Sequence, residues 1–304
     1  MTGPQSPSNG SAYSGQVATS VTRSFVVLLR PWQWPKNLLV LAVPLAAGEL
    51  TELSTLGKTV LAVIAMTMMS AATYCGNDAR DALSDRMHPL KKQRPLASGA
   101  VEVRTAVVLA ALLAAGGLTI AAVLSNLLLL VCICYLLVQV AYTLGLKHVQ
   151  LADITCIALG FVLRALAGGA ATNLPVSSAF VIVVSATSFF VASAKRGSEI
   201  ERVGADSGTR RVLATYSPEY LRVLWSCSMT ISIVSYVIWS SEISEQPVLA
   251  QLTVAPFALA LLRYASHVTA GDAEEPERVV TRDRVLLALA VIWAGIFAAR
   301  AALL

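Results

Sequence analysis

The sequence is built from long apolar runs that alternate with short charged connections. A membrane-spanning helix needs about 20 largely apolar residues, and nine runs approach this length. We place the nine spans near 37–53, 58–77, 104–124, 127–146, 154–172, 179–193, 221–240, 248–265 and 285–303. Only 13% of the residues are charged, against about a quarter in soluble domains. The pattern therefore predicts an all-α, polytopic membrane protein without a separate soluble domain.

The residues before the first span divide into two segments. Residues 1–22 are rich in Ser, Gly and Thr and lack the apolar side chains that offset the entropy loss of ordering, so we expect a disordered tail. Residues 24–34 are apolar and end in Trp32 and Trp34, and tryptophan favours the membrane interface. We predict a helix over 24–34 on the membrane surface, within a membrane catalytic domain of residues 23–304.

The charged residues indicate how the chain is oriented. Most of the 23 Lys and Arg residues precede the first span or lie in every second connection after it. An excess of Lys and Arg in short connections marks the cytoplasmic side of a membrane, so we predict a cytoplasmic N-terminus. Most Asp and Glu residues fall on the same side. The cations alone account for the predicted orientation in the membrane. The position of the carboxylates on the same side therefore requires another explanation.

The most informative carboxylates lie in the sequence NDARDALSD, at the cytoplasmic end of the second predicted span. On a helix, Asp81 lies about 60° and Asp85 about 20° around the axis from Asp78, with Asn77 one turn before Asp81. Four oxygen ligands would line one helical face, and Mg²⁺ prefers such ligands together with water and substrate phosphates. The alternative is a solvated helix end, but ionisable groups in a membrane segment favour function. We predict a magnesium site here, with the three aspartates as catalytic residues.

A basic segment, HPLKKQRPLASG, follows directly. Its Pro and Gly residues favour a shaped loop over a helix. Lys91 and Arg94 beside a magnesium site suggest phosphate binding, and Arg94 can contact oxygens through two donors. The alternative for any one of these cations is a role in topology alone.

A second cytoplasmic cluster contains Tyr142, Lys147 and Asp153, with Arg164 about three turns deeper in the fifth span. An arginine inside a span is unfavourable unless it is paired or faces water. Arg164 therefore either faces a cavity shared with Asp153 or belongs to a structural ion pair.

The connection after the sixth span begins with Lys195 and Arg196. These cations contact either an anionic substrate or acidic lipid headgroups. The five cysteines lie in or at the end of apolar runs, where we expect them to be buried as small hydrophobic side chains. We find no Walker loop, Gly-rich dinucleotide fingerprint or Ser-His-Asp pattern. We expect a membrane lipid as a partner and no nucleic acid.

These motifs resemble those of the UbiA-type intramembrane prenyltransferase superfamily. The resemblance rests on NDARDALSD, on HPLKKQRPLASG, and on Tyr142, Lys147 and Asp153, and it covers the chain after Thr22. It implies a UbiA-like bundle of nine spans in which two Asp-rich motifs hold Mg²⁺ on a prenyl diphosphate. The second motif usually carries two aspartates four residues apart, whereas here Ile157 stands four residues after Asp153.

The segments RPWQWPKN, KKQRPLASG, LGLKHVQLADITCIALGFVLRALAGG and SAKRGSE are similar to the decaprenyl-phosphate phosphoribosyltransferase branch of this superfamily. The similarity implies transfer of 5-phosphoribose from phosphoribosyl diphosphate to a polyprenyl monophosphate, for decaprenyl-phosphoryl-arabinose and cell-wall arabinan. It also implies a plasma-membrane location with a cytoplasmic active site, and it allows a homo-oligomer. The substrate-binding residues implied are Lys36, Asn37, Lys91, Arg94, Tyr142, Lys147, Asp153, Arg164, Lys195 and Arg196.

Two alternatives remain open. An aromatic prenyltransferase of the same fold would use a prenyl diphosphate and an aromatic acid. A transporter would place its polar residues near mid-membrane in repeated halves, whereas here they gather at one end of the spans.

Overall fold

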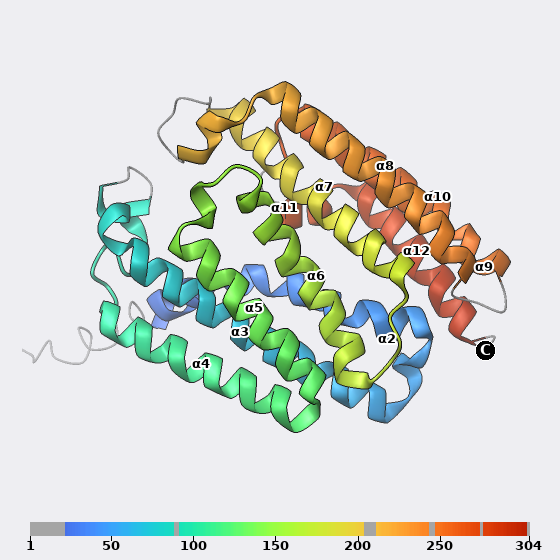
Figure 1. Ribbon diagram of the computed structural model, residues 1–304, viewed down its shortest axis with the longest axis horizontal. Coiled ribbons are helices and arrows are strands. Elements are labelled where there is room, and N and C mark those ends of the chain that lie inside the picture. The colour runs from blue at the N-terminus through green and yellow to red at the C-terminus, as the bar shows by residue number, and fades with distance from the viewer. Residues whose placement is uncertain (1–21, 88–90, 204–210, 243–246, 274–275, 303–304) are drawn as a thin grey trace, which may run out of the picture. The chain divides into compact units, whose positions relative to one another are not determined.

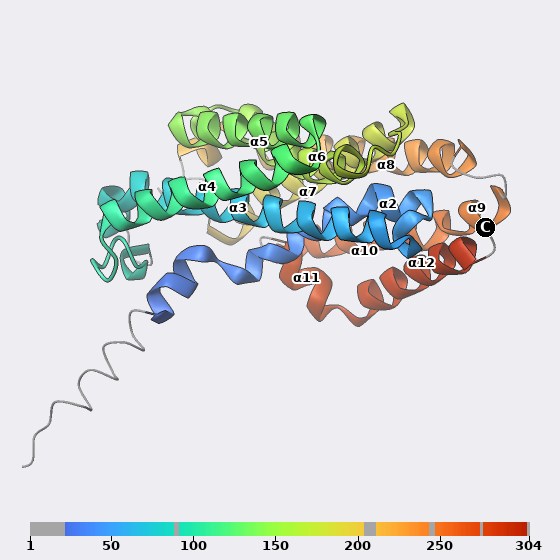
Figure 2. The same cartoon turned by 90° about the horizontal axis from the view of Figure 1, so that it is seen from below.

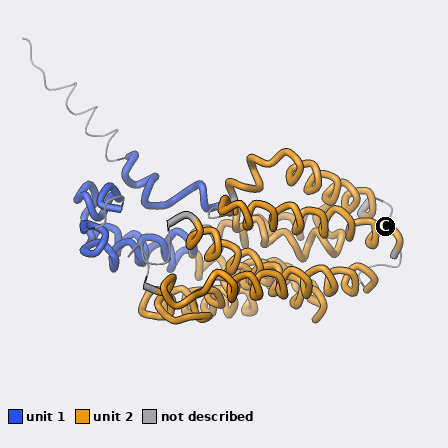
Figure 3. Tube along the Cα trace, turned by 90° about the horizontal axis from the view of Figure 1, so that it is seen from above, with its two compact units in different colours: residues 1–34, 70–116 blue, residues 35–69, 117–304 orange. Residues whose placement is uncertain are grey.

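The computed structural model describes residues 22–87, 91–203, 211–242, 247–273 and 276–302. Every regular element among these residues is a helix (Figure 1), which confirms the all-α prediction. The chain divides into two compact units (Figure 3): unit 1 contains residues 1–34 and 70–116, and unit 2 contains residues 35–69 and 117–304. Apart from Thr22, the predicted tail of residues 1–22 lies outside the described residues.

Long α-helices account for most of the described chain. They are α3 (Leu53–Arg86), α4 (Val103–Leu124), α5 (Asn126–Leu144), α6 (Ala152–Thr172), α7 (Ser178–Val203), α8 (Pro218–Glu242), α10 (Val254–Thr269) and α12 (Arg284–Ala302). The shorter α-helices are α2 (Ala42–Ala47), α9 (Pro247–Leu252) and α11 (Pro276–Arg282). The 3₁₀ helices are η1 (Pro31–Leu41), η2 (Glu49–Thr51), η3 (Lys91–Gln93), η4 (Leu146–His148) and η5 (Arg211–Thr215).

Seven helices among the described residues are long and apolar enough to span a membrane. They correspond to the second through eighth predicted spans, with α9 and α10 together forming the eighth across a turn at Thr253. The ninth predicted span corresponds to α12. The total of nine spans stays a prediction.

The first predicted span, 37–53, is not a single regular helix. It is divided into the C-terminal part of η1, α2 and η2. Pro35 lies inside η1, and a proline cannot donate the backbone hydrogen bond of a regular helix. Gly48 ends α2 with a φ of 77°, in the left-handed region, which glycine adopts readily.

The helix that precedes η1 covers residues 22–29 and is shorter than the one predicted for 24–34. It ends at Arg30, whose φ of 52° lies outside the right-handed helical region. Pro31 follows, and a proline disfavours helical backbone at the residue before it. Trp34 Nε1 donates a hydrogen bond to the Leu29 carbonyl at 3.1 Å, which folds the start of η1 back onto the end of the helix.

In unit 2, helices that follow one another in the sequence pack side by side. α5 packs on α6, α6 on α7 and α7 on α8, while α10 packs on α12 (Figures 1 and 2). α6 is the most enclosed of the seven candidate spans, with 67% of its apolar segment buried. Its buried residues are mostly Ala and Gly, and small side chains let neighbouring backbones approach closely inside a membrane.

Gly168 of α6 lies against the backbone of η1. A Cβ atom added at this position would stand 1.9 Å from the carbonyl oxygen of Val40. Because this oxygen belongs to the backbone, no side-chain rotation can relieve the clash. A glycine is therefore required where η1 crosses α6.

We expect Gly168→Ala to destabilise the protein by at least about 1–3 kcal/mol, the range for an overpacked interior, because α6 and η1 must separate. The control is Gly295→Ala in α12, where an added Cβ would meet no atom within 4 Å. Thermal unfolding of the purified protein in detergent measures both effects. An unchanged midpoint for Gly168→Ala would contradict the close backbone contact.

Asp283 directly precedes α12 and links it to α10 through its side chain. Its carboxylate accepts hydrogen bonds from the backbone N–H groups of Val285 and Leu286, at 2.7 and 3.0 Å. His267 Nε2 lies 2.7 Å from Asp283 Oδ2, and Arg263 Nε donates to the same oxygen at 2.8 Å. The contact with His267, followed by the backbone and Arg263 donors, holds the pKa of Asp283 well below its usual range, because these groups favour the charged carboxylate.

The depressed pKa of Asp283 predicts a pH-dependent contribution to stability. A carboxyl group with a lower pKa in the folded state stabilises that state above its unfolded pKa of about 4, and the contribution is lost as the pH falls toward the folded value. Asp283→Asn should therefore lower the thermal midpoint at pH 7, and its difference from the wild type should shrink below about pH 4. The exposed Asp272 provides the control, Asp272→Asn, for which we expect no change. A difference that persists unchanged in acid would contradict the ionic origin.

Candidate functional site

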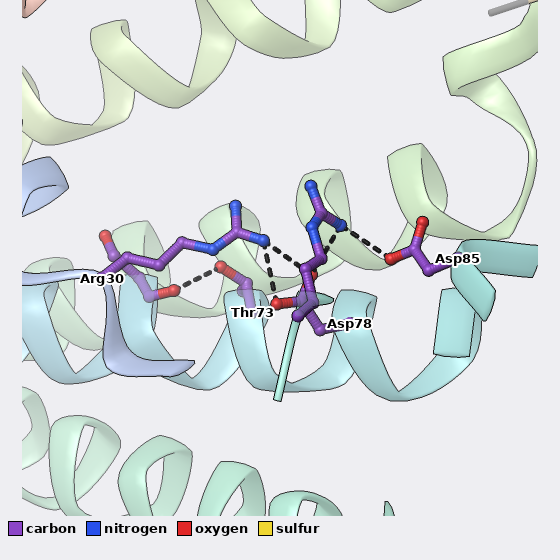
Figure 4. Close-up of polar contacts among 6 residues, drawn as sticks. Arg30, Thr73, Asp78 and Asp85 are labelled. Atoms are coloured by element: carbon purple, nitrogen blue, oxygen red, sulfur yellow. Dashed lines mark hydrogen bonds and ion pairs between the residues drawn. The ribbon is translucent and has the colours of Figure 1, made fainter. Parts of the chain in front are cut away.

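The carboxylates of the first motif lie on the C-terminal half of α3, in unit 1. Arg30 Nη2 donates to both carboxylate oxygens of Asp78, at 2.6 and 2.9 Å. Arg94 Nη1 bridges Asp78 at 3.2 Å and Asp85 at 2.8 Å. Figure 4 shows Arg30 reaching Asp78, with Asp85 farther along α3. The two aspartate side chains are 4% and 7% exposed, whereas those of Arg30 and Arg94 are 23% and 32% exposed, so these ion pairs are partly buried and differ from fully exposed surface salt bridges.

An apolar cluster holds these charged groups in place. Its core includes Leu28, Cys75, Ala82 and Leu96, each two or three residues from a member of the ion pairs. The Arg30 guanidinium also lies over the Tyr74 ring, 5.2 Å from its centroid. The contacts of Arg30 with Asp78 and with the Tyr74 ring explain how this residue keeps its positive φ, because unfavourable backbone geometry persists only where the surroundings impose it.

The other predicted residues of the first motif are half-buried. Asn77 and Asp81 lie on α3 with Asp78 and Asp85, and Lys91 begins η3. Because α3 is unbroken as far as Arg86, the motif is helical throughout. Residues 88–90, at the start of the predicted basic loop, lie outside the described residues.

The donor set of unit 1 suits a metal ion that also takes ligands from a substrate. Among the residues that the structure describes, no three His, Cys, Asp or Glu side chains form a group that could hold a metal ion. Asp78 and Asp85 nevertheless both accept hydrogen bonds from the same nitrogen, Nη1 of Arg94. Mg²⁺ is commonly bound by one or two carboxylates together with substrate phosphates and water. The oxygen donors therefore fit Mg²⁺ on a phosphate-bearing substrate and do not form a self-contained cage.

Asp153 is the centre of a buried network in unit 2. Arg196 donates from Nε to Asp153 Oδ2 at 2.6 Å and from Nη1 to Glu199 at 2.5 Å. The hydroxyl of Tyr216 donates to Asp153 Oδ1 at 2.5 Å. The Tyr142 hydroxyl lies 3.5 Å from Arg196 Nη2. Pairing with the guanidinium is what allows these carboxylates to be buried in their charged form.

The hydrogen bonds of this network give Asp153 and Arg196 a primarily structural role. Both side chains are 0% exposed, and both oxygens of Asp153 are bonded within the protein. Burial and the hydrogen bond to Asp153 raise the pKa of Tyr216 above its usual value, so its hydroxyl remains a donor. The substrate contacts predicted for Asp153 and Arg196 would require the network to open, and they stay predictions.

Arg164 lies in a second buried network of unit 2, inside α6. Its guanidinium donates to Asn37 Oδ1 at 2.8 Å, to the Tyr135 hydroxyl at 2.7 Å and to the Gly160 carbonyl at 2.7 Å. It also lies over the Tyr135 ring, 4.9 Å from the centroid. These contacts satisfy an arginine within a candidate span, where an unsatisfied charge would be unfavourable. Two predicted site residues, Asn37 and Arg164, are thereby brought together.

Lys36, Lys147 and Lys195 are the half-buried cations among the predicted residues of unit 2. They lie in η1, η4 and the last turns of α7, respectively. Lys36 directly precedes the buried Asn37, and Lys195 directly precedes the buried Arg196. Each network therefore anchors a backbone segment that carries a more exposed lysine, and these lysines are better placed than the buried arginines to meet an anion from solvent.

Four residues of these networks were not predicted from the sequence as site residues: Arg30, Tyr135, Glu199 and Tyr216. Glu199 has a local signal, because it follows Arg196 by three residues on a helix. Arg30 is one of the cations before the first predicted span, where its sequence signal is that of topology, although it interrupts an apolar segment. Tyr135 and Tyr216 lie 29 and 63 residues from their partners Arg164 and Asp153, and no local pattern reveals such a pairing.

Two pockets of unit 2 lie outside these networks. One, of about 760 Å³, is lined by residues of α10, α11, α12 and the adjoining connections, including Arg263, Arg278 and Asp283, and by none of the predicted site residues. The other, of about 450 Å³, is mainly apolar and lies between α5 and α6, with Leu146 and Leu151 in its lining.

The helices and the two clusters define an integral membrane protein with carboxylate and cationic groups suited to phosphate-bearing substrates. The chain belongs to the UbiA prenyltransferase family, whose model matches residues 38–290. It is 38% identical to a decaprenyl-phosphate phosphoribosyltransferase of Mycolicibacterium smegmatis, over 91% of this chain and 92% of that protein. It is 37% identical to the protein of the same name from Corynebacterium glutamicum, over 91% of this chain and 86% of that protein.

The fold agrees with this family. A structure of a UbiA homologue from Archaeoglobus fulgidus, bound to GPP and Mg²⁺, superimposes with a TM-score of 0.68 at 18% identity. The match covers 92% of this chain and 98% of that chain. The UbiA-like arrangement of helices expected from the motifs is thereby confirmed.

Proposed function

We propose that this protein transfers 5-phosphoribose from phosphoribosyl diphosphate to a polyprenyl monophosphate and releases diphosphate. The observation that carries the proposal is the identity of 37% and 38%, over 91% of the chain, with two decaprenyl-phosphate phosphoribosyltransferases. The protein is thus a transferase acting on a lipid-linked phosphate. Its product would supply decaprenyl-phosphoryl-arabinose and, from it, cell-wall arabinan.

In this proposal unit 1 binds the leaving diphosphate. Mg²⁺ would be held by Asn77, Asp78, Asp81 and Asp85, and when bound it would neutralise the diphosphate as the bond to the ribose C1 breaks. Arg94 and Lys91 would donate to the diphosphate oxygens. The support is chemical, because unit 1 combines oxygen donors on one helix with a guanidinium already directed toward them.

The cations of unit 2 suit the remaining phosphates. Phosphoribosyl diphosphate carries a 5-phosphate apart from its diphosphate, and the acceptor brings a third anionic group. Lys36, Tyr142, Lys147 and Lys195 would contact these groups, on segments held by the Asp153 and Arg164 networks. The acceptor phosphate is already an anion, so no strong general base is required to attack C1.

The apolar pocket between α5 and α6 offers a place for part of the prenyl tail. Leu137, Val138 and Leu159 line it, together with Leu146, which directly precedes Lys147 in η4. With the acceptor phosphate at Lys147, the attached prenyl tail would lie along this apolar pocket.

We further propose that the protein lies in the plasma membrane with nine spans, a cytoplasmic N-terminus and a cytoplasmic active site. The support is the gathering of Lys and Arg in alternate connections. The tail of residues 1–22 would be disordered, residues 23–304 would form the catalytic domain, and self-association is compatible with this arrangement.

The deciding experiment uses the purified protein with labelled phosphoribosyl diphosphate and polyprenyl phosphate, with and without EDTA. We expect label in the lipid fraction when Mg²⁺ is present and none after chelation. No lipid-linked label in the presence of Mg²⁺ would reject the proposed transfer. Full activity in EDTA would reject the proposed requirement for Mg²⁺.

The second candidate is an aromatic prenyltransferase, which the family and the structure solved with GPP and Mg²⁺ favour. It predicts product from a prenyl diphosphate and an aromatic acid, and none from phosphoribosyl diphosphate. Ile157 argues against it, because it stands where a second aspartate is expected in the second motif.

A further inference from the structure

One tyrosine fastens the segment after α7 to the segment before α6. The hydroxyl of Tyr216 donates to Asp153 Oδ1 at 2.5 Å and accepts from the backbone N–H of Leu151 at 2.7 Å. Beside it, Gln150 Nε2 donates to the carbonyl of Thr215 at 2.8 Å. Segment 211–216 therefore holds segment 150–153 through both side-chain and backbone groups.

The held segment contains a strained backbone. Leu151 has a φ of 64° and a ψ of −39°, which L-residues with a side chain rarely adopt. Among the described residues other than glycine, only Arg30, Leu151 and Asn173 have a positive φ, and Asn173 is an ordinary left-handed cap at the end of α6. A leucine in such a conformation persists only when its surroundings impose it, and Tyr216 bonds to its amide directly.

The strain lies at the junction between a candidate binding residue and a buried anchor. Lys147 stands four residues before Leu151, in η4, and Asp153 stands two residues after it, in the first turn of α6. The backbone conformation at Leu151 therefore sets the direction in which η4 leaves α6.

We propose that Tyr216 is a positioning residue, which joins Leu151 to Asp153 and thereby fixes where Lys147 stands. The kinetic part of this inference rests on the proposed function, in which Lys147 contacts a substrate phosphate. Tyr216 is 3% exposed, so it acts through Leu151 and Asp153 and does not itself meet the substrate.

The hydroxyl can be removed without disturbing the ring. The ring of Tyr216 belongs to an apolar cluster with Ile154, Val212 and Leu221 and stacks on Tyr220, with 6.4 Å between centroids and 18° between planes. Tyr216→Phe keeps these contacts and loses only the two hydrogen bonds. Tyr220→Phe is the matched control, because it removes a hydroxyl from the stacked neighbour.

Amide hydrogen exchange tests the position of the segment independently of the substrate. Tyr216→Phe should increase exchange over residues 146–153 by about tenfold, because two of the hydrogen bonds that hold this segment are lost. Tyr220→Phe should leave it unchanged. Equal exchange in Tyr216→Phe and the wild type would overturn the inference whatever the protein transfers.

Kinetics test the consequence for binding. Tyr216→Phe should raise KM for phosphoribosyl diphosphate about tenfold, with a smaller change in kcat, whereas Tyr220→Phe should match the wild type.

Leu151→Gly adopts the same backbone without strain, so the effect of Tyr216→Phe on KM should be smaller in that background. A lower unfolding midpoint with unchanged KM would reject positioning in favour of a structural role. If the wild type transfers no phosphoribose, the proposed function fails, and the exchange result still decides the role of Tyr216.

Discussion

Asp78→Asn is expected to lower kcat/KM by on the order of 10³-fold. Asparagine keeps the shape of the side chain and one oxygen, but it removes the charge that would bind Mg²⁺ and that now pairs with Arg30 and Arg94. Neutralisation of a leaving group by a metal supplies several kcal/mol of transition-state stabilisation, and each 1.36 kcal/mol corresponds to a factor of ten in rate.

The assay for Asp78→Asn follows transfer of labelled phosphoribose over a series of Mg²⁺ concentrations. The variant should require more Mg²⁺ for half of its own maximal rate. Glu102→Gln is the control, because Glu102 is an exposed carboxylate of unit 1 outside the motif, and it should behave as the wild type. Normal turnover in Asp78→Asn, or in Asp81→Ala, would contradict the magnesium assignment.

Arg196→Leu is expected to destabilise the protein by about 3–5 kcal/mol, the range for removing one partner of a buried ion pair. The change would leave Asp153 and Glu199 buried without the guanidinium that now bonds to both. Adding Glu199→Gln to this variant should restore part of the stability, because one of the two buried charges is removed.

Thermal and denaturant unfolding in detergent measure these effects. Arg222→Leu is the matched control, since Arg222 is an exposed arginine near the start of α8, and its effect should be small. If Arg196→Leu instead abolished transfer while stability stayed unchanged, Arg196 would act on the substrate and not as the structural centre described above.

The helical character of the first motif follows from local sequence alone. Asp78, Asp81 and Asp85 repeat at helical spacing after a long apolar run, and α3 continues unbroken through all three. The seven candidate spans are likewise predictable, because the bilayer requires long apolar helices and the sequence supplies them. Pro44 and Glu49 interrupt the apolar run of the first predicted span, and the structure divides this segment.

The pairing of charges does not follow from local sequence. Arg30 lies 48 residues from Asp78, and Tyr216 lies 63 residues from Asp153. A cation in a cytoplasmic connection has the same sequence signal whether it orients the chain, binds a phosphate or pairs with a buried carboxylate. Lys195 and Arg196 illustrate this, because they are adjacent in sequence and only Arg196 is fully buried.

The sequence by itself determined that this protein is a helical membrane protein with carboxylates on one helical face, because apolar length and helical spacing are local properties. Only the tertiary structure decided which cations are engaged in ion pairs, that Asp153 is a buried centre of hydrogen bonds, and that Leu151 is held in a strained backbone. These features depend on residues far apart in the chain meeting in a desolvated interior, where burial and partner geometry set the energy of each charge.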